Sequence, residues 1–278
     1  MRKKINKKFI VTLVGFLIGV ALVLYPTVSD FINSLKYQSL VKHYNNDVEE
    51  INVDEYENIL EEAQNYNEQL FKRKTTIVTI DENEKTNYSE LLNINDTSIM
   101  GYIEIPKIKL AVPIYHGTSA EALQIGVGHM EESSLPIGGI NTHSAISGHS
   151  GLPSAKLFTD IGKLEIGDTF YIKVLKEVLT YEVDNIATVE PDELDLLEIE
   201  EGKDYVTLIT CTPYGINTHR LLVRGHRVET IYNENNKSVI DEIEDSKFYV
   251  LIIIGIIMVL LIILITIKLL KNRSSKCK

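Results

Sequence analysis

The chain has 278 residues, of which 44% are hydrophobic and 24% are charged, and its formal net charge is −11. Such an acidic chain is repelled by a phosphate backbone, which argues against nucleic-acid binding. Apolar runs occupy both ends, and the part between them is long enough for one domain with a proper core and a smaller helical region.

The first apolar run, 9–26, reads FIVTLVGFLIGVALVLYP and carries no charge. As a helix it spans roughly 27 Å, which is close to the hydrocarbon thickness of a bilayer. The basic segment 1–8 precedes it, so the N-terminus is expected in the cytoplasm. A cleaved signal peptide is the alternative, but the run is slightly long and Thr27-Val28-Ser29 is only a weak cleavage site. We therefore expect an uncleaved anchor.

Residues 27–74 place apolar side chains at helical spacing among acids, asparagine and glutamine. This pattern predicts two amphipathic helices with a break near Asn45-Asn46-Asp47. No heptad is sustained, so we expect the pair to pack on the main domain rather than form a coiled-coil stalk. Residues 75–98 hold a short β-like run, 75–80, and then a polar stretch, which together predict a linker or a mobile loop.

Residues 99–232 consist mainly of short β-runs separated by turn signals. Short helices are expected at 119–124 and 192–197. Many short strands with few helices predict a β-barrel or a sandwich. A polar connector, 233–247, follows. The expected strands lie in GYIEIPKI, KLAVPIY, HSAISG, DTFYIKVL, VLTYEVDNIATV, YVTLITC and HRLLVRGHRVE.

The second apolar run, 248–267, is also uncharged and has the length of a spanning helix. No face of it is polar, so a buried core helix is a poor alternative. We expect the span to cover 248–270 and the basic tail 271–278 to be cytoplasmic. Both termini are then inside the cell, and everything between the two spans is outside.

Only two cysteines are present, Cys211 and Cys277, and this topology separates them by the membrane. Cys211 is thus a lone thiol in an oxidising exterior, which marks it as reactive. It ends an apolar strand, 205–210, before a turn at 212–215, where a side chain is both held and exposed. A buried, inert cysteine is the alternative. As a nucleophile, a thiol is partly ionised near neutral pH and leaves well from a thioester.

A thiol nucleophile needs a partner that handles protons, and the chain offers seven histidines. His149 lies in Ser-Gly-His-Ser-Gly just past an expected strand, where the flanking glycines allow close backbone approach. His143 is six residues earlier, and the residues alone rank His149 only slightly above it.

An oxyanion formed by attack of Cys211 needs a fixed cation or hydrogen-bond donor. Arg220 and Arg224 lie on one face of the next expected strand, about 13 Å apart. If that strand turns back beside the cysteine strand, Arg220 is the closer one. A surface salt bridge is the alternative for either arginine. Metal-ligand spacing and phosphate-binding glycine loops are lacking, so no metal or cofactor is expected.

Two long motifs resemble those of sortases. TLITC at 207–211 is similar to the sortase signature TLxTC, and the longer run 207–227, TLITCTPYGINTHRLLVRGHR, resembles class C sortases. The segment 143–158, HSAISGHSGLPSAKLF, resembles the histidine segment of that family. The resemblance covers about 99–230, and the helical region and the C-terminal span are also typical of class C.

The resemblance implies an eight-stranded sortase β-barrel with short helices, preceded by a helical region and flanked by two transmembrane helices. Carried over residue by residue, it implies Cys211 as nucleophile, His149 as acid/base and Arg220 as the arginine that stabilises the oxyanion and the substrate. His143 and Thr210 are the candidates for supporting roles.

One feature departs from the class C pattern. Many class C sortases have a lid over the active site that an Asp-Pro-aromatic motif anchors, but residues 75–98 contain no proline. A lid of the usual kind is therefore not expected, and Tyr88 is the aromatic residue that remains as a substitute.

The resemblance also implies a function: a cysteine transpeptidase in the cell membrane of a Gram-positive bacterium, with its barrel outside. It would cleave an LPxTG-like signal between Thr and Gly through a thioester on Cys211. A lysine of a secreted pilin would resolve the thioester in pilus assembly, and a cell-wall precursor amine would resolve it in surface-protein anchoring. A catalytically dead scaffold and a plain cysteine hydrolase are the alternatives.

Overall fold

A computed structural model describes residues 7–75, 88–94, 97–193 and 195–230, together with two helical positions, Gly255 and Ile257. Two compact units divide the chain, Met1–Tyr232 and Asn233–Lys278, and the first unit holds both the helical region and the strands. Apart from Gly255 and Ile257, the second expected span, its connector and the basic tail lie outside the described residues.

The strands form where short apolar stretches occur between turns. In β5 every second side chain is buried, which is the pattern of a strand with one face on the core. The whole of β1 is buried instead, because helix α1 contacts the outer side of β1 and β2. The bounds are β1 (Ile99–Ile105), β2 (Leu110–His116), β3 (Val127–His129), β4 (Thr142–Ser147), β5 (Thr169–Val174), β6 (Glu177–Val189), β7 (Asp204–Thr212) and β8 (His219–Val228).

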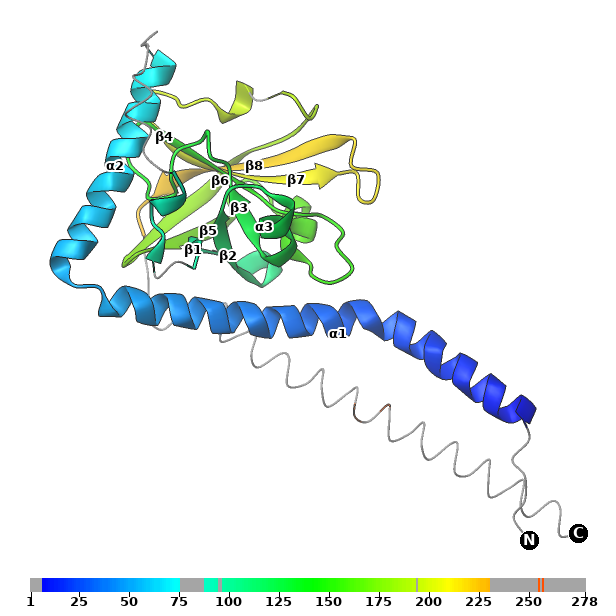
Figure 1. Cartoon of the computed structure of the whole chain (residues 1–278). Helices are drawn as coiled ribbons and strands as arrows, with labels where there is room; N and C mark the ends of the chain where they lie inside the picture. Colours follow the sequence, from blue (N-terminus) through cyan, green and yellow to red (C-terminus); the bar gives the residue numbers. More distant parts are fainter. Residues whose placement is uncertain are drawn as a thin grey trace, which may run out of the picture. The chain divides into compact units, whose positions relative to one another are not determined.

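These eight strands close into one barrel in the order β1-β2-β3-β4-β7-β8-β6-β5 (Figure 1). The predicted eight-stranded barrel is thereby confirmed. Most neighbouring strands are antiparallel, but β2 runs parallel to β3 and β4 runs parallel to β7. The core includes the stacked rings of Phe170 and Tyr181, whose centroids are 5.6 Å apart, and the fully buried Phe158.

Within the described part of Met1–Tyr232, three α-helices and several 3-10 turns accompany the barrel. Ser119 caps the short helix expected near it, since its hydroxyl accepts a hydrogen bond from the Ala122 N–H. Of the second expected short helix, 192–197, the structure shows only a 3-10 turn. The helices are α1 (Lys7–Glu50), α2 (Val53–Thr75) and α3 (Ala120–Ile125), and the 3-10 turns are η2 (Tyr88–Glu90), η4 (Pro106–Ile108), η5 (Leu157–Lys163) and η6 (Asp195–Leu197).

Helix α1 runs without interruption from the first expected span to Glu50, so the predicted break near Asn45 is wrong. Asn45 stays helical and its side chain donates to the Tyr102 hydroxyl at 3.3 Å. The break comes at Asn52 instead. The Asn52 side-chain oxygen accepts from the Glu55 N–H at 2.9 Å, and its amide donates to the Glu55 carboxylate at 3.2 Å. This reciprocal capping begins α2.

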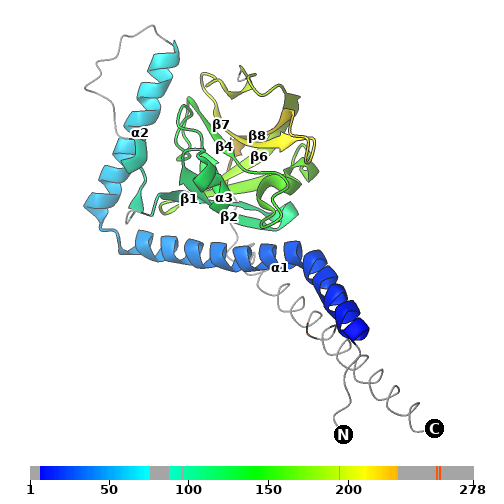
Figure 2. The same cartoon turned by 45° about the vertical axis from the view of Figure 1, so that its right-hand side comes forward.

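The C-terminal part of α1 packs on the barrel (Figures 1 and 2). The Tyr44 hydroxyl donates to the Met100 carbonyl at 3.0 Å and accepts from the Leu175 N–H at 2.8 Å. One stripe of α1 is buried, at three- and four-residue spacing, as expected of a helix with a single apolar face. That stripe consists of Tyr37, Val41, Tyr44 and Val48.

The N-terminal part of α1 has a different surface. Large apolar side chains such as Phe16, Leu22 and Val23 are exposed there. The described helix Gly15–Glu50 is long and apolar enough, by length and composition, to cross a membrane. Pro26 lies inside α1, at the end of the expected span.

Candidate active site

Because β4 and β7 are paired in parallel, their C-terminal ends lie at the same end of the barrel, and these ends lead to His149 and carry Cys211. Ser147 is the partner of Ile209, and both strands end within a few residues of this pair. Beyond it, the Gly148 N–H donates to the Ile209 carbonyl at 2.9 Å. The residue after Gly148 is His149, so the histidine backbone follows directly on a contact with the cysteine strand.

Thr210 strengthens this junction. It is buried, and its hydroxyl donates to the Gly148 carbonyl at 2.7 Å. The side chain next to Cys211 therefore holds the residue next to His149. A supporting role of Thr210 in catalysis stays a prediction.

Arg220 lies directly opposite Cys211 in the antiparallel pair of β7 and β8. Directly opposed residues in such a pair have Cα atoms about 4.5–5.5 Å apart. The arginine strand does return beside the cysteine strand, which is the condition on which the choice of Arg220 depends. The Arg220 guanidinium donates to the backbone carbonyls of His219 and Asn217, at 3.1 and 3.4 Å. Within the described residues no carboxylate forms a salt bridge with it.

Arg224 is held by acids instead. Its guanidinium forms two bonds to the Asp184 carboxylate, at 2.9 and 3.2 Å, and one to Glu200 at 3.2 Å. It also lies over the Tyr205 ring, 4.1 Å from the centroid. Arg224 pairs with Thr207, four residues before Cys211. Arg224 thus forms a salt bridge, which is the alternative role expected for either arginine.

His143 lies at the other end of β4 from His149. It pairs with Tyr205, six residues before Cys211, a separation of about 20 Å along a strand. Its ring is buried, with one nitrogen 2.8 Å from the Glu198 carbonyl and the other 2.7 Å from the Thr207 hydroxyl. The structure therefore does not bring His143 to Cys211. Its ring contacts join β4 to Thr207 of β7 and to Glu198, which follows η6.

The Cys211 thiol is free and half-buried near the end of β7. Cys277 lies outside the described residues. Phe158 also belongs to this region, because a Cβ added to Gly148 would lie 2.7 Å from the Phe158 ring. The Phe158 side chain has no polar atom, so the sequence alone does not single it out. The sequence feature that indicates its close packing is Gly148, directly before His149.

Tyr88 does not cover Cys211. Its hydroxyl lies 2.8 Å from the His129 Nδ1 and accepts from the Gly117 N–H at 3.1 Å. Its ring stacks on His129 and meets the edge of His116. These partners place Tyr88 against the ends of β2 and β3. Residues 76–87, which precede it, lie outside the described residues.

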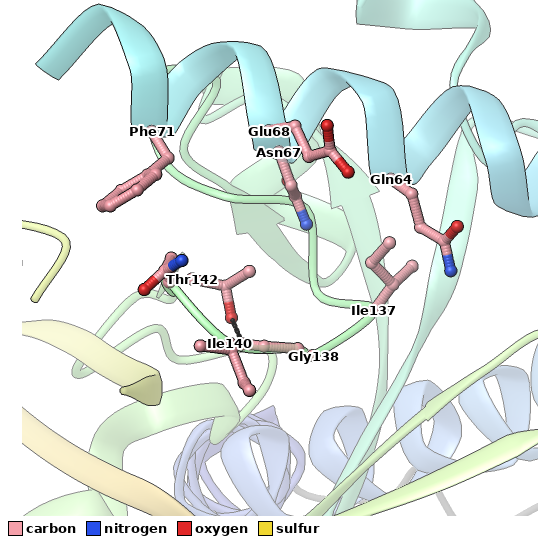
Figure 3. Close-up of a pocket in the computed structure, with 10 residues that line it drawn as sticks. Gln64, Asn67, Glu68, Phe71, Ile137, Gly138, Ile140 and Thr142 are labelled. Carbon is pink, nitrogen blue, oxygen red and sulfur yellow. Dashed lines mark hydrogen bonds between the residues drawn. The ribbon is translucent and has the colours of Figure 1, made fainter. Parts of the chain in front are cut away.

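A cavity of about 190 Å³ lies between α2 and the segment 137–142 (Figure 3). Asn67 closes one side of it with two bonds to the Leu135 backbone, at 2.7 and 3.2 Å. The cavity borders the first residue of β4, whereas His149 follows the last. It is therefore separate from the cysteine site. Among the described residues, no group of three His, Cys, Asp or Glu side chains is arranged to hold a metal.

A family model described as the sortase domain matches residues 103–228. The crystal structure of sortase C1 from Streptococcus agalactiae is similar with 49% sequence identity and a TM-score of 0.64, covering 69% of this chain and 99% of that chain.

Two further likenesses extend this result. An X-ray structure of Clostridium perfringens sortase C with the C-terminal cell wall sorting motif shows 44% identity and a TM-score of 0.60, covering 69% of this chain and 99% of that chain. Sortase A of Bacillus anthracis is 29% identical over 161 residues, which make up 57% of this chain and 75% of that protein.

Proposed function

Because this chain belongs to the sortase family, with class C sortases as its structural neighbours, we propose that Cys211, His149 and Arg220 are its catalytic residues and that its substrates are secreted proteins with an LPxTG-like sorting signal. Sortases are cysteine transpeptidases, and this chain is one of them. The observation that carries the assignment is the meeting of three strand ends: β4 leads to His149, and β7 and β8 set Cys211 opposite Arg220.

This arrangement supports a two-step acyl transfer. In the first step the Cys211 thiolate attacks the threonine carbonyl, a carbon–sulfur bond forms, and the Thr–Gly bond breaks as His149 gives a proton to the leaving amine. In the second step an acceptor amine attacks the thioester and loses its proton to His149. The Cys211 thiolate then leaves. Arg220 lies where it can stabilise the oxyanion of each tetrahedral intermediate.

The acceptor amine in this proposal is the lysine side chain of a second pilin subunit. The likeness to class C sortases, one of which has pilin substrates, favours this acceptor. An amine of a cell-wall precursor is the second candidate, and it would make the same thioester anchor surface proteins. The barrel would work on the outer face of a Gram-positive cell membrane, to which the apolar part of α1 attaches it.

Acyl-enzyme formation tests the assignment of the nucleophile. The full chain in lipid nanodiscs is incubated with an LPxTG peptide, and intact mass spectrometry measures the thioester adduct. We expect the adduct on the wild type and on Cys277→Ala, and none on Cys211→Ala. A thioester on Cys211→Ala would sink the proposal.

The acid/base is tested by peptide transfer to an amine. We expect His149→Ala to abolish transfer. His143→Ala, near the start of the strand that leads to His149, should lose activity only in proportion to lost folded protein. Equal losses per folded molecule would leave His149 unsupported.

The rate of thioester resolution distinguishes the acceptors. It is measured with a pilin that carries the acceptor lysine, with a cell-wall precursor amine and with water alone. Fastest resolution by the pilin indicates polymerisation, by the precursor amine anchoring, and by water hydrolysis.

A further inference from the structure

His149 is followed by a loop, 150–156, that returns to the turn η5. Both ends of this loop are tied down near the histidine. The Phe158 N–H donates to the His149 carbonyl at 3.1 Å, and the Gly151 N–H donates to the Thr159 hydroxyl at 3.0 Å. Because the fully buried Phe158 also packs on Gly148, the position of His149 depends on where the return of this loop lies.

Two side chains of helix α1 bind the second half of the same loop. The Asn33 amide donates to the Ser154 carbonyl at 2.7 Å, and the Asp30 carboxylate accepts from the Lys156 N–H at 2.9 Å. Asp30 and Asn33 are three residues apart and so lie on one face of the helix. They satisfy one acceptor and one donor of an irregular backbone segment, which must find partners outside regular secondary structure.

These contacts join the membrane anchor to the catalytic histidine. Asp30 is only four residues beyond Pro26, where the apolar run of α1 ends. The path from α1 to His149 consists of the two α1 hydrogen bonds, the loop backbone and the bond between Phe158 and His149. Each step is a direct contact in the structure, and the sequence separations of 121 and 126 residues exclude a merely local role.

We propose that Asp30 and Asn33 are positioning residues of the active site, and that the turn of α1 just outside the membrane holds the His149 loop in its working geometry. The proposal rests on the catalytic role assigned to His149. General acid–base transfer requires hydrogen-bond reach, and a misplacement of about 1 Å can cost on the order of 100-fold in rate. A barrel cut away from this turn of α1 would keep its catalytic residues but lose the support of the loop.

The test uses the full chain in nanodiscs. Asp30→Ala removes the acceptor for the Lys156 N–H, and Asn33→Asp replaces a donor with an acceptor facing the Ser154 carbonyl. We expect each to lower kcat for peptide transfer about 10- to 100-fold, with KM changed less than about threefold. Asp30→Asn retains a side-chain oxygen and should recover most of the loss. Each rate is divided by the folded fraction of that variant, measured by urea unfolding, so that unfolded enzyme does not count.

Asn45→Ala is the matched control, because it removes a helix-to-barrel hydrogen bond of α1 away from the loop. We expect it to keep kcat near that of the wild type. The pH profile of kcat is a second readout, since a displaced His149 changes that profile and a simple loss of stability does not.

Two results would overturn the proposal. In the first, Asp30→Ala and Asn33→Asp have kcat values within twofold of that of Asn45→Ala. In the second, their loss of kcat vanishes after correction for the folded fraction and the pH profile of kcat stays the same. If the wild type itself forms no thioester on Cys211, the proposed function fails first. If that thioester forms and these variants transfer normally, only the positioning role fails.

Discussion

Arg220 and Arg224 lie four residues apart on β8, yet their partners differ. Arg220 faces Cys211 and bonds only to backbone carbonyls among the described residues, whereas Arg224 is held by Asp184 and Glu200. A planar guanidinium next to a nucleophile offers paired donors that an ammonium cannot copy. The two arginines should therefore respond differently to the same substitution.

We expect Arg220→Lys to reduce peptide transfer by about 100- to 1,000-fold while alkylation of Cys211 by a small thiol reagent continues at a similar rate. Arg224→Lys should transfer peptide nearly normally but lose about 1 kcal/mol of stability, because the fork to Asp184 is broken. Transfer rates, alkylation rates and urea unfolding measure these effects. If Arg224→Lys were the crippled enzyme, the arginine assignment would fail.

His129 is a second residue with a clear physical signature. It is fully buried beside Tyr88, and burial lowers its pKa to about 4, although its hydrogen bond to the Ser134 carbonyl opposes the shift. An unfolded histidine takes up a proton near pH 6.5, while the folded one resists until about pH 4. The stability contributed by neutral His129 is thus complete above pH 6.5 and lost as the pH falls toward 4.

We expect the free energy of unfolding to fall by up to about 3 kcal/mol more in the wild type than in His129→Gln between pH 7.5 and pH 4. Urea unfolding of both proteins at several pH values gives the difference, and the carboxylates that both share cancel. Parallel curves would show that His129 does not titrate in this way.

The choice between His149 and His143 shows what the sequence leaves open at this scale. One histidine lies near the start of an expected strand and the other just past its end, so spacing alone ranks them almost equally. The pairing of β4 with β7 sets His143 beside Tyr205 and leads the chain to His149 at the end of the strand pair that also carries Cys211. The resemblance to the sortase motifs points to His149 rather than His143, because members of a family share the same strand pairing.

Among the elements, the junction of β4 with η5 depends on close packing. A Cβ at Gly148 would lie 2.7 Å from the Phe158 ring and 2.9 Å from a methyl of Val127. Buried rings have little room to move, so an added methyl group forces the strand end and the turn apart.

We expect Gly148→Ala to cost about 1–3 kcal/mol of stability and to reduce peptide transfer per folded enzyme, because the strand end leads directly to His149. Replacing the ring in Gly148→Ala/Phe158→Leu should restore part of both. Urea unfolding and transfer rates of the two variants measure this. A double variant that is no better than Gly148→Ala would argue that the ring is not what the methyl meets.

The elements also show why some boundaries escape prediction. Short apolar runs were enough to predict a barrel or sandwich, since each strand carries its own local signal. The end of α1 was misplaced because asparagines at 45–46 have low helix propensity. Tertiary contact overrides that preference at Asn45, and the true break follows from the reciprocal cap at Asn52. Asp30 and Asn33 contact residues more than a hundred positions away in the sequence, so no local sequence pattern predicts these contacts.

For the whole molecule, the sequence predicts a membrane topology with two spans, and the described residues cover only part of it. Helix α1 can cross a membrane, while the second span remains a prediction from charge and length.

We expect both termini in the cytoplasm and residues 30–246 outside. On intact cells, a membrane-impermeant maleimide should label Cys211 but not Cys277, and permeabilised cells should show both. Variants with one cysteine each make the signals separable. Labelling of Cys277 from outside would overturn the predicted topology of the C-terminal end.

Helix α1 passes without a break from its apolar part to the buried stripe under β1 and β2. A continuous helix has a fixed rise of about 1.5 Å per residue, so under the proposed membrane attachment α1 would set the height of Cys211 above the lipid. Under the proposed function, a substrate anchored in the same membrane would have to present its sorting signal at that height. The number of residues between the signal and the substrate's own membrane segment would then select substrates independently of the amino-acid sequence of the signal.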